Sequence, residues 1–301
     1  MVWPFLWVPL TLAASAAQVA RNGAQASLTA RIGTLGATQT RFVFGLPFAA
    51  LFLNAALLLG GEHLPQFDAA ALGWTALGAA CQIGGTATML MVMGRRAFSV
   101  GYAYIKTEPV TVALLGVVIL GDRLPALAWL AVAVVTLGVL IASLPPDQYR
   151  KLPAEKGMIA LGIFSGALYG LSSIAFRGGI EALDDGGFVV RSLSVLVLSL
   201  AMQTVLLGCW LALFDHAGFI GSIREWRRSF GAGFAGATAS ALFFTAFALT
   251  PAANVRTLAL ADLPIAALLS GRLTGRRTRR HELVGMITIA AGVVLLLAAH
   301  A

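Results

Sequence analysis

Charge is what this sequence lacks most. Asp, Glu, Lys and Arg make up only 11 % of its 301 residues, less than half of the roughly 25 % found in soluble domains. Hydrophobic residues reach 58 %. A helix that crosses a membrane needs about 20 apolar residues, so helices of that length with short loops would use the whole chain. The composition therefore excludes a sizeable soluble domain and predicts an all-α membrane protein.

Cysteine and histidine are scarce and scattered. Cys81 and Cys209 both fall inside apolar runs, where we expect free, packed thiols. The four histidines are His63, His216, His281 and His300. They lie far apart and show no metal-ligand spacing. There is also no glycine-rich phosphate loop and no serine in a nucleophile-elbow context. We therefore expect no catalytic residues, no metal and no cofactor.

Acidic residues are outnumbered, 13 against 21 basic ones. The basic residues sit in short clusters between apolar runs, so we interpret them as topology determinants and not as a nucleic-acid surface. Those expected on one face are Arg21, Arg31, Arg95, Arg96, Arg150, Lys151, Lys156, Arg224, Arg227, Arg228, Arg272, Arg276, Arg277, Arg279 and Arg280. The opposite face has few cations, Arg123, Arg177 and Arg191, and it also has the acids Glu62, Asp68, Asp122, Glu181, Asp184 and Asp185. The positive-inside rule then predicts a multi-pass protein of the inner membrane with both termini outside.

Ten apolar segments are present, and their backbone groups must be paired internally, which requires helices. The segments are 4–27, 37–59, 69–93, 98–119, 126–144, 157–176, 188–213, 229–249, 254–271 and 282–299. The first residues lack the positive region of a signal peptide, so we expect the first segment to be a true helix. The linker-like stretch 145–156 lies at the midpoint and suggests two halves, 1–148 and 149–301.

The two halves resemble weak repeats of each other. Glu108 precedes Gly121 by thirteen residues, with Pro109 beside it, and Asp262 precedes Gly275 by the same interval. Each acid is followed by an apolar run, a short polar turn and a final apolar helix. Five helices is an odd number, so the second repeat must be inverted in the membrane. Inverted repeats are common in secondary transporters, whose substrate sites lie near the bilayer midplane.

Three motifs carry a resemblance to a known family. They are 18–22 (QVARN), 41–47 (RFVFGLP) and 107–110 (TEPV), the last leading through 114–116 (LLG) to 120–124 (LGDRL). With the ten segments in two halves, the chain resembles the EamA type of the drug/metabolite transporter superfamily over its whole length. The resemblance implies transport of a small metabolite. Three features depart from the family pattern: Asp122 replaces a frequent Glu, Arg276 follows Gly275, and the charge count reverses the usual cytoplasmic termini.

Ionisable side chains inside apolar segments are the first candidates for function. Lys106 and Glu108 lie roughly 12–15 Å into the fourth segment, near the middle of a ~30 Å core. Asp262 lies at a similar depth in the ninth. Each charge costs about 2.5–3.5 kcal/mol unless it is paired or hydrated. Lys106, Glu108 and Asp262 either line a cavity that binds substrate or a proton, or form an interhelical ion pair such as that of Lys106 with Asp262. Arg256, near a segment end, is expected to reach the headgroups.

Further polar residues could line the same cavity. Gln18, Arg21 and Asn22 form a stripe at helical spacing in the first segment, with Arg21 available to an anionic group. The alternative is that they lie at the membrane interface beyond the helix end. The remaining candidates are Gln82, Tyr102, Tyr169 and Ser173. Plain interhelical hydrogen bonds are their alternative role.

These observations favour a secondary transporter that exports a small polar metabolite by alternating access. Its partners are the substrate and the lipid bilayer, with a monomer or a homodimer both open. Proton coupling, facilitated diffusion and exchange are all compatible with the sequence. The alternatives are an integral-membrane enzyme, for which no cluster of catalytic acids or histidines is present, and a non-transporting scaffold, which would have a fully packed core between its halves.

Overall fold

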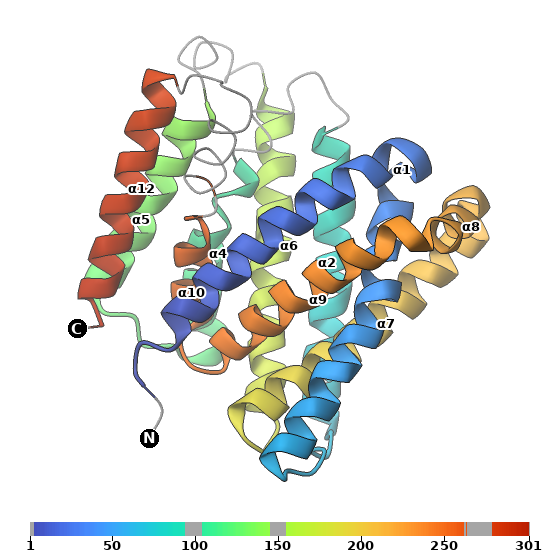
Figure 1. Cartoon of the computed structure of the whole chain (residues 1–301). Coiled ribbons are helices and arrows are strands. Elements are labelled where there is room, and N and C mark those ends of the chain that lie inside the picture. The colour runs from blue at the N-terminus through green and yellow to red at the C-terminus, as the bar shows by residue number, and fades with distance from the viewer. Residues whose placement is uncertain (1–2, 94–103, 145–154, 262, 264–278, 301) are drawn as a thin grey trace. The chain divides into compact units, whose positions relative to one another are not determined.

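The computed structural model describes residues 3–93, 104–144, 155–261, 263 and 279–300 (Figure 1). Within these ranges the regular elements are all helices, with no strand. This confirms the predicted all-helical class. The structure is compatible with a multi-pass membrane protein because six helices are long and apolar enough to cross a bilayer. They are Arg31–Gly60, Ala126–Ser143, Lys156–Glu181, Phe188–Phe214, Trp226–Phe247 and Arg280–Ala298.

The first two predicted segments form one kinked helix, α1 (Trp7–Gly60). The kink lies at Gly33, where φ is 70° and ψ is 173°. This backbone region is open almost only to glycine. Figure 1 shows the two arms of α1 meeting at an angle. Of the two arms, only the second, from Arg31 onward, is among the six helices that satisfy the length and hydropathy requirements.

Two other predicted segments are broken. Where one helix was expected over 98–119, the described part has a turn at residues 106 and 107, then α4 (Glu108–Leu115) and a π-helical end, η1 (Gly116–Leu120). The ninth segment begins as the short helix α10 (Ala252–Ala259), after Pro251. Residues 262 and 264–278 lie outside the described part. In the described residues, neither the fourth nor the ninth predicted segment is one continuous helix.

The chain divides into two compact units. The first unit contains 1–83 and 175–249, and the second contains 84–174 and 250–301. Each unit takes residues from both halves of the sequence, and α2 (Ala69–Met93) and α6 (Lys156–Glu181) run from one to the other. The division of the chain into repeats 1–148 and 149–301 concerns internal symmetry, and it stays a prediction.

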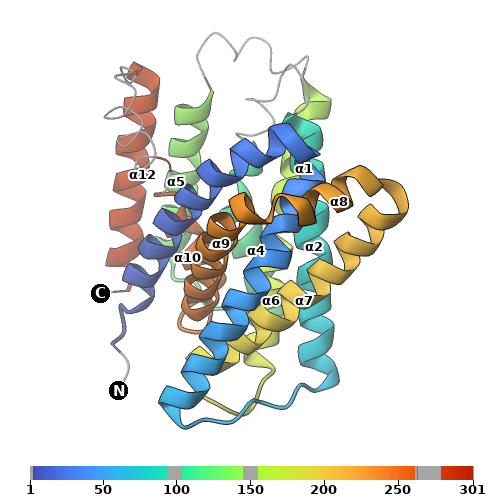
Figure 2. The same cartoon turned by 45° about the vertical axis from the view of Figure 1, so that its right-hand side comes forward.

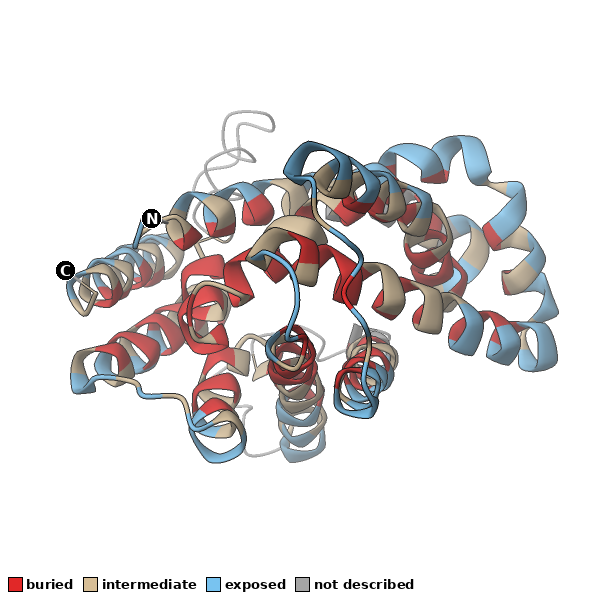
Figure 3. Ribbon diagram, turned by 90° about the horizontal axis from the view of Figure 1, so that it is seen from below, coloured by how far each residue is buried: buried red, intermediate tan, exposed pale blue. Residues whose placement is uncertain are grey.

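In the first unit, α1 packs on α7 (Phe188–Phe214), α8 (His216–Arg224) and α9 (Trp226–Phe247). The helices α1 and α9 approach so closely at Gly233 that a Cβ there would lie 2.7 Å from the carbonyl oxygen of Phe44. One helical turn after Phe44, Phe48 of α1 makes edge-to-face contacts with Phe230 and Phe234 of α9. In Figure 3 the helices carry buried residues on one side and exposed residues on the other, as expected when lipid or water faces the outer side.

In the second unit, α5 (Ala126–Ser143) and α12 (Arg280–Ala298) lie side by side in both views (Figures 1 and 2). Glycines allow this contact: a Cβ at Gly285 would lie 2.6 Å from the carbonyl oxygen of Gly138. Small residues at helix interfaces permit such backbone approach in membranes. The core beside this seam consists of Val135, Val139, Leu260 and Ile289. The short helices α4 and α10 pack against each other next to it.

Candidate functional site

The chain breaks its helix immediately before Glu108. Residues 106 and 107 form a turn, and the hydroxyl of Thr107 donates to the carbonyl oxygen of Tyr104 at 2.7 Å. Glu108 then occupies the first turn of α4, followed by Pro109, which tolerates this position because the first helical N–H groups have no partner. The partial positive charge of a helix N-terminus stabilises a carboxylate placed there. The acid-proline step therefore starts a short helix with its acid at the positive end.

Arg256 of α10 is the partner of that carboxylate. Its Nη2 and Nε atoms each lie 2.5 Å from Glu108 Oε1. The two side chains are 19 % and 13 % exposed, so the pair is shielded from the surroundings on most sides. The expectation that Arg256 reaches the headgroups is therefore wrong. The sequence could not indicate this pairing, because 148 residues separate Arg256 from Glu108.

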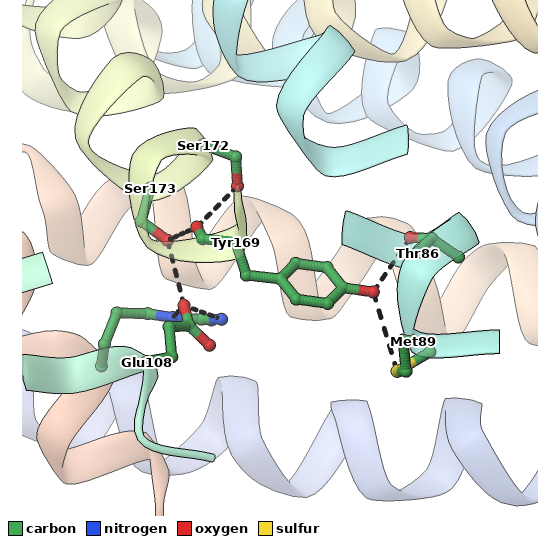
Figure 4. Close-up of polar contacts among 7 residues, drawn as sticks. Thr86, Met89, Glu108, Tyr169, Ser172 and Ser173 are labelled. Atoms are coloured by element: carbon green, nitrogen blue, oxygen red, sulfur yellow. Dashed lines mark hydrogen bonds and ion pairs between the residues drawn. The ribbon is translucent and has the colours of Figure 1, made fainter. Parts of the chain in front are cut away.

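Helix α6 adds hydroxyl groups to the pair (Figure 4). Ser173 Oγ lies 3.5 Å from Glu108 Oε1 and also donates to the carbonyl oxygen of Tyr169, one turn earlier. The Tyr169 hydroxyl is 3.0 Å from Thr86 Oγ1 and 3.8 Å from the sulfur of Met89. Glu108, Arg256, Ser173, Tyr169 and Thr86 thus form one polar chain across four helices of the second unit, which we call the Glu108 cluster.

The remaining ionisable candidates are only partly visible. Lys106 is half-buried in the turn before α4. Tyr102 and Asp262 lie outside the described residues, so the alternative pairing of Lys106 with Asp262 stays a prediction. Of the candidates in this part of the chain, the structure therefore brings together Glu108, Tyr169 and Ser173.

A second polar group belongs to the first unit. Gln82 Oε1 of α2 accepts from Gln203 Nε2 of α7 at 2.6 Å and from Arg41 Nη2 of α1 at 3.3 Å. The aliphatic stems of Arg21 and Arg41 both lie beside Gly236 of α9, where a Cβ would be 3.3 Å from Arg21 Cδ. Arg21 is on the first arm of α1 and Arg41 is on the second, so both arms contribute the aliphatic part of an arginine next to Gly236.

The polar stripe predicted on the first segment is part of α1. Gln18 is half-buried there. The helix continues past residue 22, so these residues do not lie beyond a helix end, as the alternative proposed. The side chain of Asn22 lies outside the described part. Arg21, a residue of this stripe, lies beside Arg41 at Gly236.

Sequence reasoning missed two buried glutamines. Gln203 and Gln39 are 0 % and 1 % exposed, and the Oε1 atom of each has no hydrogen-bond partner among the described residues. Gln39 Nε2 donates to the carbonyl oxygen of Thr204 at 3.0 Å. A buried amide oxygen without a partner costs about 1–3 kcal/mol. Their positions in the apolar runs of α1 and α7 were the signal that could have identified them.

Other predicted features have plainer outcomes. Cys81 and Cys209 are both free, as expected, the first buried and the second exposed. In the ranges covered by the structure, no group of three or more His, Cys, Asp or Glu side chains is placed to hold a metal ion. His300, at the end of α12, has its Nε2 atom 2.9 Å from Asn254 Nδ2, which links α12 to α10.

Comparison with known proteins bears on the fold alone. No family model matches the sequence. No curated protein matches it either. Among solved structures, 27 chains match. One, described as "Crystal structure of protein", aligns over 98 % of this chain and 99 % of its own with a TM-score of 0.65 and 14 % identity. The whole length of the chain is therefore similar in fold to a crystallised protein.

Proposed function

We propose that the protein is a secondary transporter of the inner membrane that moves a small polar metabolite outward by alternating access. The observation that carries the proposal is the Glu108–Arg256 pair. An ionisable pair among apolar helices is costly, and such groups mark substrate or ion pathways by default. Here both members lie on short helices, at the first turn of α4 and the last turn of α10.

Interrupted helices support the same proposal. In many secondary transporters, binding sites form where membrane helices break, because half-helix ends present charge and free backbone groups to the ligand. The turn before Glu108 and the end of α10 at Ala259 provide two such places, and hydroxyls of the Glu108 cluster lie next to the first. With the resemblance to the EamA type, this favours transport over an integral-membrane enzyme or a scaffold.

The finer architecture belongs to the proposal. We expect ten transmembrane helices in two inverted repeats of five, with the termini outside as the arginine and lysine distribution predicts. Lys106 and Asp262 are proposed to extend the Glu108 cluster. In this arrangement a ligand with charged or hydroxyl groups would compete for the contacts that now join Glu108, Arg256 and Ser173.

The test begins with ligand discovery on purified protein. Amino acids, sugars, nucleotides and amines would be screened for an increase in melting temperature, and compounds that stabilise the protein would be used in proteoliposome transport assays. We expect the Glu108→Gln variant to lose transport of such a compound. The matched control is Glu181→Gln, which removes an acid that is 45 % exposed at the end of α6 and should leave transport intact.

An imposed pH gradient decides the coupling mode in the same vesicles. If Glu108 carries the coupled proton, the gradient should drive uptake in the wild type and not in Glu108→Gln. Uncoupled exchange or diffusion would instead proceed equally with and without the gradient. Failure of every screened compound to bind, or full transport by Glu108→Gln, would contradict the proposed role of the cluster.

A further inference from the structure

The short helix α8 lies between two candidate membrane spans. Helix α7 ends at Phe214 and α9 begins at Trp226, and both are long and apolar enough to cross a bilayer. If one span leaves the membrane where the next one enters, α8 lies at that surface. Its first turn is fixed by Asp215, whose Oδ1 accepts from the backbone N–H of Gly218 at 3.0 Å.

The inner side of α8 is made of small residues. Gly218 and Ser222 are buried, and a Cβ at Gly36 of α1 would lie 3.1 Å from the carbonyl oxygen of Gly218. A Cβ at Gly221 would lie 2.8 Å from Ile32 Cγ2. This close contact holds α8 against α1 beside the Gly33 kink. The surface that α8 presents outward is therefore a defined feature of the first unit.

The outer side of α8 and its flanks are apolar and exposed. The exposed large side chains there are Phe214, Ile220, Ile223, Trp226 and Phe230. Ile220 and Ile223 lie one helical turn apart on α8 and are 47 % and 51 % exposed. An amphipathic surface helix with such an apolar side lies in the boundary between headgroups and acyl chains.

Cations lie immediately beside this apolar surface. Arg224, Arg227 and Arg228 are all exposed, and the guanidinium of Arg227 lies 5.3 Å from the ring centre of Trp226. Glu225 Oε1 lies 3.8 Å from Arg31 Nη1, and Glu225 Oε2 lies 3.9 Å from Arg228 Nη1. Arg31 and segment 215–228 together hold four arginines against two acids, Asp215 and Glu225, which leaves an excess of positive charge at this corner.

We propose that this surface, formed by Ile220, Ile223, Arg224, Trp226, Arg227 and Arg228 and called the α8 corner, binds the headgroup of an anionic phospholipid. Guanidinium groups match phosphate oxygens in geometry and charge. The adjacent isoleucines and Trp226 contact the acyl chain next to that headgroup. A soluble anion would use the arginines alone, whereas a phospholipid uses both parts of the surface. The inference does not depend on which solute is transported.

Quenching of Trp226 by brominated lipid provides a direct test. The protein would be placed in phosphatidylcholine nanodiscs that contain a minor fraction of brominated phosphatidylglycerol or of brominated phosphatidylcholine. Subtracting the signal of Trp226→Phe isolates the emission of this residue. We expect stronger quenching by brominated phosphatidylglycerol, because arginines near a membrane surface attract anionic lipid.

Three variants give the experiment its controls. The triple variant R224Q/R227Q/R228Q should lose the preference, and R224K/R227K/R228K should keep most of it because the charge remains. Replacing the exposed Arg279 and Arg280 by Gln at the start of α12 should leave quenching of Trp226 unchanged. The proposal is overturned if both brominated lipids quench the wild type equally, or if the triple glutamine variant retains the wild-type preference while its melting shows a folded protein.

Discussion

Breaking the Glu108–Arg256 pair should destabilise the protein strongly, and the loss should be non-additive. The side chains are 13 % and 19 % exposed, and two guanidinium nitrogens contact one carboxylate oxygen at 2.5 Å. Removing one partner of a buried pair costs about 3–5 kcal/mol because the other charge is left unpaired. We expect Glu108→Gln near the lower end of this range, since the amide oxygen can still accept from Arg256. Arg256→Gln should cost more, because the carboxylate loses both guanidinium contacts and keeps the long contact from Ser173 at 3.5 Å.

The double variant E108Q/R256Q carries no charge at either of these two positions. Its loss of stability should therefore be smaller than the sum of the two single losses, with a coupling energy of about 2–3 kcal/mol. The measurement is equilibrium unfolding in mixed detergent micelles, followed by tryptophan fluorescence. Glutamine at both positions keeps the size and hydrogen-bonding capacity of the two sites close to the original.

A second ion pair provides the reference cycle. Arg177 and Glu181 of α6 are 2.7 Å apart, but Glu181 is 45 % exposed and the two residues are four positions apart on one helix. Such exposed pairs contribute about 0.3–0.5 kcal/mol. We expect a coupling of that size for R177Q/E181Q. If the stability losses of Glu108→Gln and Arg256→Gln simply add in the double variant, the two side chains are not energetically coupled. That result, or an equal coupling energy in the two cycles, would refute the assignment of Glu108–Arg256 as a buried, interacting pair.

Three further predictions concern topology and backbone contacts. In intact cells, after removal of the native cysteines, an impermeant thiol reagent should label Leu64→Cys and not Gly157→Cys, and the opposite pattern would reverse the predicted orientation. Gly285→Ala should destabilise the protein by about 1–3 kcal/mol, because its Cβ would lie 2.5 Å from the backbone nitrogen of Ala142. Gly33→Ala should cost about 1–3 kcal/mol because of its positive φ. In chemical unfolding, Gly157→Ala, whose Cβ meets open space, should stay near wild-type stability and serve as the control for both.

The sequence by itself determined the class of the protein. Long apolar runs with few charges must satisfy their backbone groups internally, which demands helices, and all regular elements in the described ranges are helices. Local chemistry also marked Glu108 and Pro109 as an unusual step. These features can be predicted because helical hydrogen bonds join residues four positions apart, and because apolar runs are visible directly in the sequence.

Only the tertiary structure decided which polar groups meet. Arg256 is two residues into its predicted segment, and nothing local shows that it pairs with Glu108 across 148 positions. The same holds for Gln203 and Gln82, on different helices. Within a run of apolar residues, each polar side chain has the same local pattern whether it faces lipid or a neighbour. The packing of α4, α6 and α10 settles that question for the Glu108 cluster, since burial away from water requires each charge to find a partner.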